Sequence, residues 1–98
     1  MSPREYSPEI ARCFGENVMA ARERANITQE ELAFSASLHR TEIGLLERGG
    51  RLARIDTVVK LAGSLDVPPG DLLKGMAWQP RRAPRGKFIT RRAEGRAG

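Results

Sequence analysis

The chain has 98 residues, of which 40% are apolar, so it can build one domain with a small hydrophobic core. Its one cysteine, Cys13, excludes an internal disulfide and fits a reducing compartment, and no apolar run approaches the roughly 18 residues of a membrane span. The first residues, "MSPREYSPEIAR", contain acidic side chains and are not expected to form a leader peptide.

Positive charge is concentrated in the C-terminal part of the chain. The net charge is +5, yet residues 1–76 hold ten Lys and Arg against eleven Asp and Glu, a net charge of −1. Residues 77–98 hold seven Lys and Arg against the single Glu94, a net charge of +6. Such a tail points to a polyanion, most often a nucleic acid, but a solvated end that keeps the protein soluble is an equal alternative.

The first two helices are marked by apolar periodicity and by capping residues. A helix is expected from about residue 8 to 25, because apolar side chains recur there at helical spacing: Ile10, Phe14, Val18 and Ala21. Asn26, which tolerates positive φ, is expected to end this helix. The second helix opens with "TQEE", in which Thr28 and Glu31 can form a capping box.

Three further helices are expected before the tail. The third begins near His39 and stops at the two glycines of "ERGG". The fourth runs from about residue 55 to 65, and a short fifth opens at "PPGDLL". Only "GKFIT" is expected to form a short extended segment. We therefore expect an all-α, five-helix fold with a basic, largely extended C-terminal tail. Its parts are an N-terminal arm (1–7), a helical domain (8–76) and a basic extension (77–98).

The third helix carries a glycine in its interior. Gly44 costs about 1 kcal/mol of helix stability relative to alanine, and Leu45 falls where a water-facing side chain is expected. Arg40 and Thr41 share the face of Gly44, opposite the apolar side. Arginine can bind guanine, threonine a base edge, and an apolar group a thymine methyl, while glycine allows close approach. This face therefore suits the major groove of DNA.

The stretch "TQEELAFSASLHRTEIGLLERG" resembles the helix-turn-helix of phage-repressor-like DNA-binding domains, the Cro/cI type, also called XRE-like. The positions that match the family pattern are Gln29, Leu32, Ala33, Leu38, Ile43, Leu46, Glu47 and Gly49. The likeness extends to "LAGSLDVPPGDLL" and covers roughly residues 13–74. It implies a lambda-repressor-like DNA-binding domain whose recognition helix, about residues 39–48, enters the major groove of double-stranded DNA.

The face of the third helix and the resemblance together assign roles to individual residues. The residues expected to contact bases are Arg40, Thr41, Gly44 and Leu45. The residues expected to contact the DNA backbone are Gln29, His39, Arg48, Arg51 and Arg54. The resemblance also implies a structural ion pair between the first and third helices, formed by Arg22 and Glu47.

Other interpretations stay open at several of these positions. Gly44 can instead relieve packing against another helix, Leu45 can contact a partner subunit or the tail, and the arginines after the third helix can lie in a solvated loop. The chain also departs from the family pattern at three positions, one of which is Leu45, where polar residues are usual. Ser37 replaces the usual turn glycine, and His39 replaces the usual Ser or Thr at the start of the recognition helix.

Nothing in the sequence indicates an enzyme. The one histidine and the one cysteine have no metal-ligand spacing, and no glycine-rich phosphate loop is followed by a lysine, so no metal or cofactor is expected. We predict a cytoplasmic, sequence-specific transcriptional regulator, a repressor, that binds double-stranded DNA as a homodimer and does not bind membranes. Two alternatives remain. One is an antitoxin or restriction-system controller that also binds an unknown protein, and the other is a protein-interaction adaptor that does not bind DNA.

Overall fold

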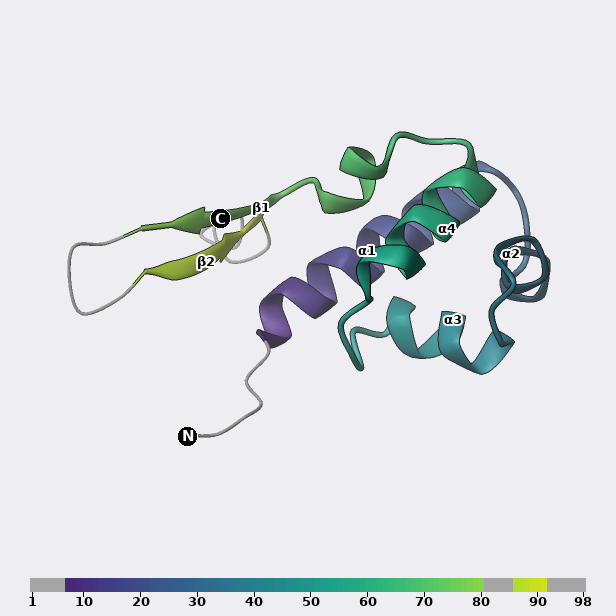
Figure 1. Cartoon of the computed structure of the whole chain (residues 1–98), viewed down its shortest axis with the longest axis horizontal. Coiled ribbons are helices and arrows are strands. Elements are labelled where there is room, and N and C mark those ends of the chain that lie inside the picture. The colour runs from purple at the N-terminus through teal and green to yellow at the C-terminus, as the bar shows by residue number, and fades with distance from the viewer. Residues whose placement is uncertain (1–6, 81–85, 92–98) are drawn as a thin grey trace.

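Four α-helices and a β-hairpin make up the part of the chain that the structure, a computed structural model, describes, namely residues 7–80 and 86–91. The α-helices are α1 (Pro8–Arg24), α2 (Gln29–Ala36), α3 (Arg40–Glu47) and α4 (Ile55–Leu65). A 3-10 helix, η1 (Pro69–Leu73), follows, and then come the two strands, β1 (Met76–Gln79) and β2 (Lys87–Thr90). In Figure 1, α2 and α3 lie to one side of α1, and the hairpin extends toward the other side.

The helix ends are set by local hydrogen bonds, as the capping residues predict. The Thr28 side chain accepts from the amide of Glu31 at 3.0 Å, and the Glu31 carboxylate accepts from the amide of Thr28 at 2.8 Å, which completes the expected capping box. Asn26 adopts a φ of 61°, the left-handed conformation expected after α1. Ser37, at the usual glycine position, also adopts a left-handed φ of 57°. Ser37 therefore adopts the left-handed conformation that glycine favours, although it carries a side chain.

A single hydrophobic core lies between the four helices and η1. Its largest fully buried apolar side chains are Val18, Leu32, Ile43, Leu46, Leu61 and Leu72. The backbones of α1 and α3 approach closely at Gly15, where an added Cβ would lie 2.2 Å from the carbonyl oxygen of Leu46. This close approach brings the last turn of α3 against α1, which matters for the contacts of Glu47 described below.

The hairpin corrects the expected all-α fold. β1 and β2 pair antiparallel, with Trp78 opposite Phe88. The segment "GKFIT" contains β2, in agreement with its expected extended conformation. β1 was not expected, because "MAWQ" contains no β-branched residue and does not alternate between apolar and polar side chains. Of the described part of the expected basic tail, residues 77–79 and 87–90 belong to these two paired strands.

The segment expected to form the fifth helix is not α-helical, which is a second correction. The segment forms the five-residue 3-10 helix η1, because the backbone becomes extended at Lys74 and leaves too few residues for a ladder of α-helical hydrogen bonds. Residues 1–6 of the expected N-terminal arm, and residues 81–85 and 92–98 of the expected extension, lie outside the described residues. The division of the chain at residues 8 and 77 stays a prediction.

Candidate nucleic-acid interface

Helix α3 presents one polar face to solvent. Arg40 and Thr41, in its first turn, are exposed, whereas Ile43 and Leu46 are buried in the core. His39 precedes the helix as its N-cap, and its Nδ1 accepts a hydrogen bond from the amide of Thr41 at 3.1 Å. An accepting Nδ1 leaves the proton of a neutral imidazole on Nε2, so the exposed His39 can still donate to a ligand. The start of α3 thus exposes three hydrogen-bonding side chains.

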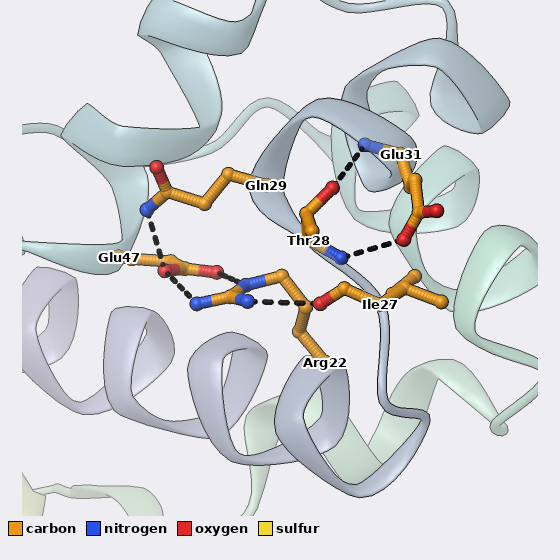
Figure 2. Close-up of polar contacts among 6 residues, drawn as sticks. All are labelled: Arg22, Ile27, Thr28, Gln29, Glu31 and Glu47. Carbon is orange, nitrogen blue, oxygen red and sulfur yellow. Dashed lines mark hydrogen bonds and ion pairs between the residues drawn. The ribbon is translucent and has the colours of Figure 1, made fainter.

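The other end of α3 is held by a buried carboxylate, that of Glu47 (Figure 2). Arg22, on α1, donates from Nε to Oε2 of Glu47 at 2.6 Å and from Nη2 to Oε1 at 3.1 Å. Gln29, at the start of α2, donates from Nε2 to the same Oε1 at 3.0 Å. The Glu47 side chain is only 1% exposed. One carboxylate therefore fixes three helices relative to each other.

The guanidinium of Arg22 is satisfied on both sides. Its Nη1 donates to the carbonyl oxygen of Ile27 at 3.0 Å, in the loop between α1 and α2 (Figure 2). Hydrogen bonding to Glu47 raises the pKa of Arg22 above its ordinary value. Two-point contacts of this kind have fixed geometry, because the planar guanidinium matches the carboxylate. The ion pair therefore sets the angle at which α3 meets α1.

Gly44 and Leu45 do not lie freely on the exposed face of α3. Gly44 is buried, and an added Cβ would lie 3.1 Å from Nη1 of Arg48 and 3.9 Å from the amide group of Gln29. Leu45 is half-buried, and its side chain covers the backbone of Gly50 in the following loop. An added Cβ would lie at ordinary contact distance from Gln29 of α2, so packing against another helix does not by itself require the glycine. The roles of Gly44 and Leu45 in base contact stay predictions.

Three arginines extend the positive surface beyond α3. Arg48, Arg51 and Arg54 are all exposed. Arg54 donates from Nη2 to Oδ2 of Asp56 at 3.2 Å, and both side chains are largely exposed. An ion pair in water is worth only about 0–1 kcal/mol, so Arg54 can exchange this carboxylate for a phosphate at small cost.

Residues 18–72, which contain this whole arrangement, match the sequence model of the helix-turn-helix family. The chain belongs to the helix-turn-helix family. The control protein C.BamHI of Bacillus amyloliquefaciens is 44% identical to it over 65 residues, which are 65% of this chain and 80% of that protein. The control protein C.SmaI of Serratia marcescens is 38% identical over 65 residues, 66% of this chain and 77% of that protein.

Solved structures of helix-turn-helix proteins have the same fold. The restriction-modification controller protein C.AhdI from Aeromonas hydrophila superposes with a TM-score of 0.62 at 35% identity, over 63% of this chain and 94% of that one. The P22 c2 repressor protein, solved in complex with a synthetic operator, superposes with a TM-score of 0.59 at 27% identity, again over 63% and 94%. The chain is accordingly a DNA-binding regulator of the helix-turn-helix type, as the resemblance implied.

Most of the predicted site residues of this helix-turn-helix lie on or beside α3. Arg22 and Glu47 are in contact with each other, and Gln29 joins them. Sequence reasoning did not anticipate the Ile27 carbonyl as a partner of Arg22, since a backbone oxygen leaves no signal in the side-chain pattern. Within the described residues, no group of three or more His, Cys, Asp or Glu side chains is placed to hold a metal ion. No helix there is long and apolar enough to cross a membrane.

Proposed function

We propose that this chain is a controller of a restriction-modification system, a cytoplasmic homodimer that binds operator DNA with α3 in the major groove and acts without catalysis. The observation that carries the proposal is the exposed Arg40–Thr41 face at the start of α3, set at a fixed angle by the buried carboxylate of Glu47. The likeness to C.BamHI and C.AhdI, named as a control protein and a restriction-modification controller protein, supports the biological setting.

Base readout is assigned to the face at the start of α3. Arg40 would donate to O6 and N7 of a guanine, which is the commonest specific contact in the major groove. Thr41 would contact a neighbouring base edge, and Leu45 a thymine methyl. Gly44, buried under the side chains of Gln29 and Arg48, would serve by keeping the α3 backbone uncrowded and close to the bases. Each assignment concerns a different base pair, so each can be tested separately.

Backbone contacts are assigned to the groups around α3. Gln29 uses one N–H of its amide for Glu47, and the second N–H is left for a phosphate oxygen. His39 would donate from Nε2, while Arg48, Arg51 and Arg54 supply charge after the helix. Such contacts fix the orientation of a protein on the duplex without reading its sequence. They would hold Arg40 and Thr41 over the correct base pairs.

Two copies are required because the reading face, the exposed face of Arg40 and Thr41 at the start of α3, is small. One short helix reads only a few base pairs, and helix-turn-helix dimers bind two half-sites about 34 Å apart. Nuclease footprinting on genomic fragments, including the DNA upstream of the chain's own gene, tests the proposal. We expect protection of paired half-sites that is lost with Arg40→Ala, and a reporter fused to the same DNA gives the sign of regulation, expected to be repression. A chain that protects no fragment would be the protein-interaction adaptor instead, and a tightly co-purifying protein would indicate an antitoxin.

A further inference from the structure

Glu42 is an acidic residue on the helix that the proposed function places in the major groove. It is half-buried and follows Arg40 and Thr41 directly in the first turn of α3. The first residues of a recognition helix are the ones that reach base edges. The phosphates on both sides of the groove repel a carboxylate, so the charge of Glu42 opposes binding to DNA in general. A carboxylate at this position therefore needs a hydrogen-bond donor that offsets its charge.

Capping of α3 does not use the Glu42 side chain. In α2 the third residue, Glu31, closes a capping box, because its carboxylate accepts from the amide of Thr28 at 2.8 Å. Glu42 is the third residue of α3, but there only the N-cap side chain of His39 makes a capping bond, to the amide of Thr41. In the part of the chain that the structure describes, the Glu42 side chain forms no hydrogen bond and no ion pair. Its carboxylate is therefore available to a ligand, whereas that of Glu31 is occupied.

Glu42 borders the reading face on the side away from α2. Gly44 lies on the side of α2, since an added Cβ there would be 3.9 Å from the amide group of Gln29. Residues three apart are neighbours on a helix surface, so Glu42 lies beside Leu45 at the opposite border. Glu42 is therefore placed to meet a base edge adjacent to the one assigned to Leu45.

Cytosine is the base whose edge in the major groove best matches a carboxylate. An ionised carboxylate can only accept hydrogen bonds. Guanine presents N7 and O6 there, and thymine presents O4, all of which are acceptors that repel it. Adenine presents an amino donor beside the acceptor N7, whereas cytosine presents its N4 amino group with no acceptor on the same base. A carboxylate at this edge therefore favours cytosine and disfavours the other three bases.

We infer that Glu42 determines specificity by accepting a hydrogen bond from the N4 amino group of a cytosine in each half-site. This role of Glu42 rests on the proposed function, which places α3 in the major groove. Glu42 contributes discrimination and not affinity, because its charge opposes binding to every DNA and is offset only at the cytosine. It differs in this respect from Arg40, whose charge favours binding to any DNA.

Selection of bound sites from random DNA, with the full chain and two variants of Glu42, tests this role. Sites selected by the wild-type chain should contain one strongly preferred cytosine in each half-site that depends on Glu42. Glu42→Gln should change the preference at that position to adenine, because a glutamine amide binds N6 and N7 of adenine together. Glu42→Ala should lose the preference there and keep it at every other position. An unchanged preference in both variants would overturn the inference.

A modified base tests the contact itself. In a cytosine that is paired with guanine, a methyl group on N4 points into the major groove and replaces the hydrogen that would be donated to Glu42. A labelled duplex with N4-methylcytosine at the selected position should therefore bind the wild-type chain roughly tenfold more weakly, as measured by fluorescence anisotropy. The same modification should leave binding by Glu42→Ala unchanged. Equal sensitivity of the two proteins to the methyl group would contradict the assigned contact.

Asp66→Asn is the matched control for the change in charge. Asp66 is exposed at the end of α4 and has a left-handed φ of 58°, which asparagine also adopts. Both Asp66→Asn and Glu42→Gln remove one negative charge, but only Glu42→Gln should change the preferred base. Equal base preferences in the two variants would mean that the charge of Glu42 acts at a distance and reads no base.

A purely structural role of Glu42 makes a different prediction. An acidic side chain in the first turn also stabilises a helix through its dipole. If that were its whole role, Glu42→Gln would lower the free energy of unfolding in urea and leave the base preference unchanged, which would overturn the inference. A chain that selects no site from random DNA contradicts the proposed function as well, whereas a chain that selects paired half-sites without a cytosine dependent on Glu42 contradicts this inference alone.

Discussion

Replacing Glu47 by glutamine changes one oxygen to an NH₂ group at the centre of the contacts between α1, α2 and α3. The carboxylate of Glu47 accepts two hydrogen bonds from Arg22 and one from Gln29, so both of its oxygens face N–H donors. A glutamine in the same place can accept through one oxygen only, and its NH₂ group must face another donor. The substitution therefore leaves the Arg22 guanidinium, 15% exposed, without its counter-charge.

The expected loss in the free energy of unfolding follows from this burial. Removing one member of a buried ion pair costs about 3–5 kcal/mol. Because Arg22 is slightly exposed and keeps its bond to the Ile27 carbonyl, we expect the lower end, about 3 kcal/mol. For a domain of this size 1 kcal/mol corresponds to roughly 4–8 °C in melting temperature, so Tm should fall by roughly 12–24 °C. The pKa of Arg22 is raised, so the stability that comes from the protonation of Arg22 is fully present below the ordinary pKa of arginine and is lost as pH rises through the folded value.

Urea titration of the wild-type chain and the variant measures this loss directly. Glu30→Gln is the matched control, since Glu30 is exposed in the first turn of α2 and should cost well under 1 kcal/mol. A double-mutant cycle with Arg22→Met separates the pair energy from general damage, and the two losses should be strongly non-additive. A loss below about 1 kcal/mol for Glu47→Gln, or additive losses in the cycle, would refute the reasoning.

Three further predictions concern DNA. Arg40→Ala should weaken operator binding by about 1–3 kcal/mol and relax preference at one base pair, as measured by selection of bound sites from random DNA, and unchanged discrimination at every position would exclude Arg40 as a base reader. Gly44→Ala should raise the free energy of unfolding in urea titration by up to about 1 kcal/mol, because only the flexible end of the Arg48 side chain must move. The same substitution should weaken DNA binding if the α3 backbone lies against the bases. Changing the three arginines among residues 80–86 to glutamine should flatten the slope of log affinity against log salt concentration by up to about 0.9 for each phosphate that is no longer neutralised. The preferred DNA sequence should not change. An unchanged slope would mean that these charges do not contact DNA.

The helical part of the fold could be predicted because its signals are local. Thr28 and Glu31, which form the capping box, are three positions apart at the start of α2. Asn26, with its left-handed φ, lies two positions after the last residue of α1. The observed bounds of α4 coincide with the expected ones. η1 was expected as an α-helix because its length depends on where the following backbone turns extended, at Lys74, which the apolar pattern does not report.

The hairpin could be predicted only in part because its stability is not local. β2 contains β-branched residues, whereas β1 contains none. β1 forms because it pairs with β2. The pair is then fixed by Arg91 and Asn17, which are 74 positions apart in the chain. A pattern read within a window of ten to twenty residues cannot detect such a contact. The same holds for Gly44, whose burial depends on Gln29 from another helix.

Glu47 links the stability of the fold to the placement of the reading face. The carboxylate lies at the last residue of α3, whereas the proposed base readers lie in its first turn. A rigid helix of eight residues transmits any change in its C-terminal angle to Arg40 and Thr41. Gln29 takes part at both levels, since it donates to Glu47 and has a second N–H for a phosphate. Loss of the Glu47 carboxylate should therefore reduce operator affinity even in molecules that remain folded, and it should do so without altering which bases are preferred, because the side chains that meet the bases are unchanged.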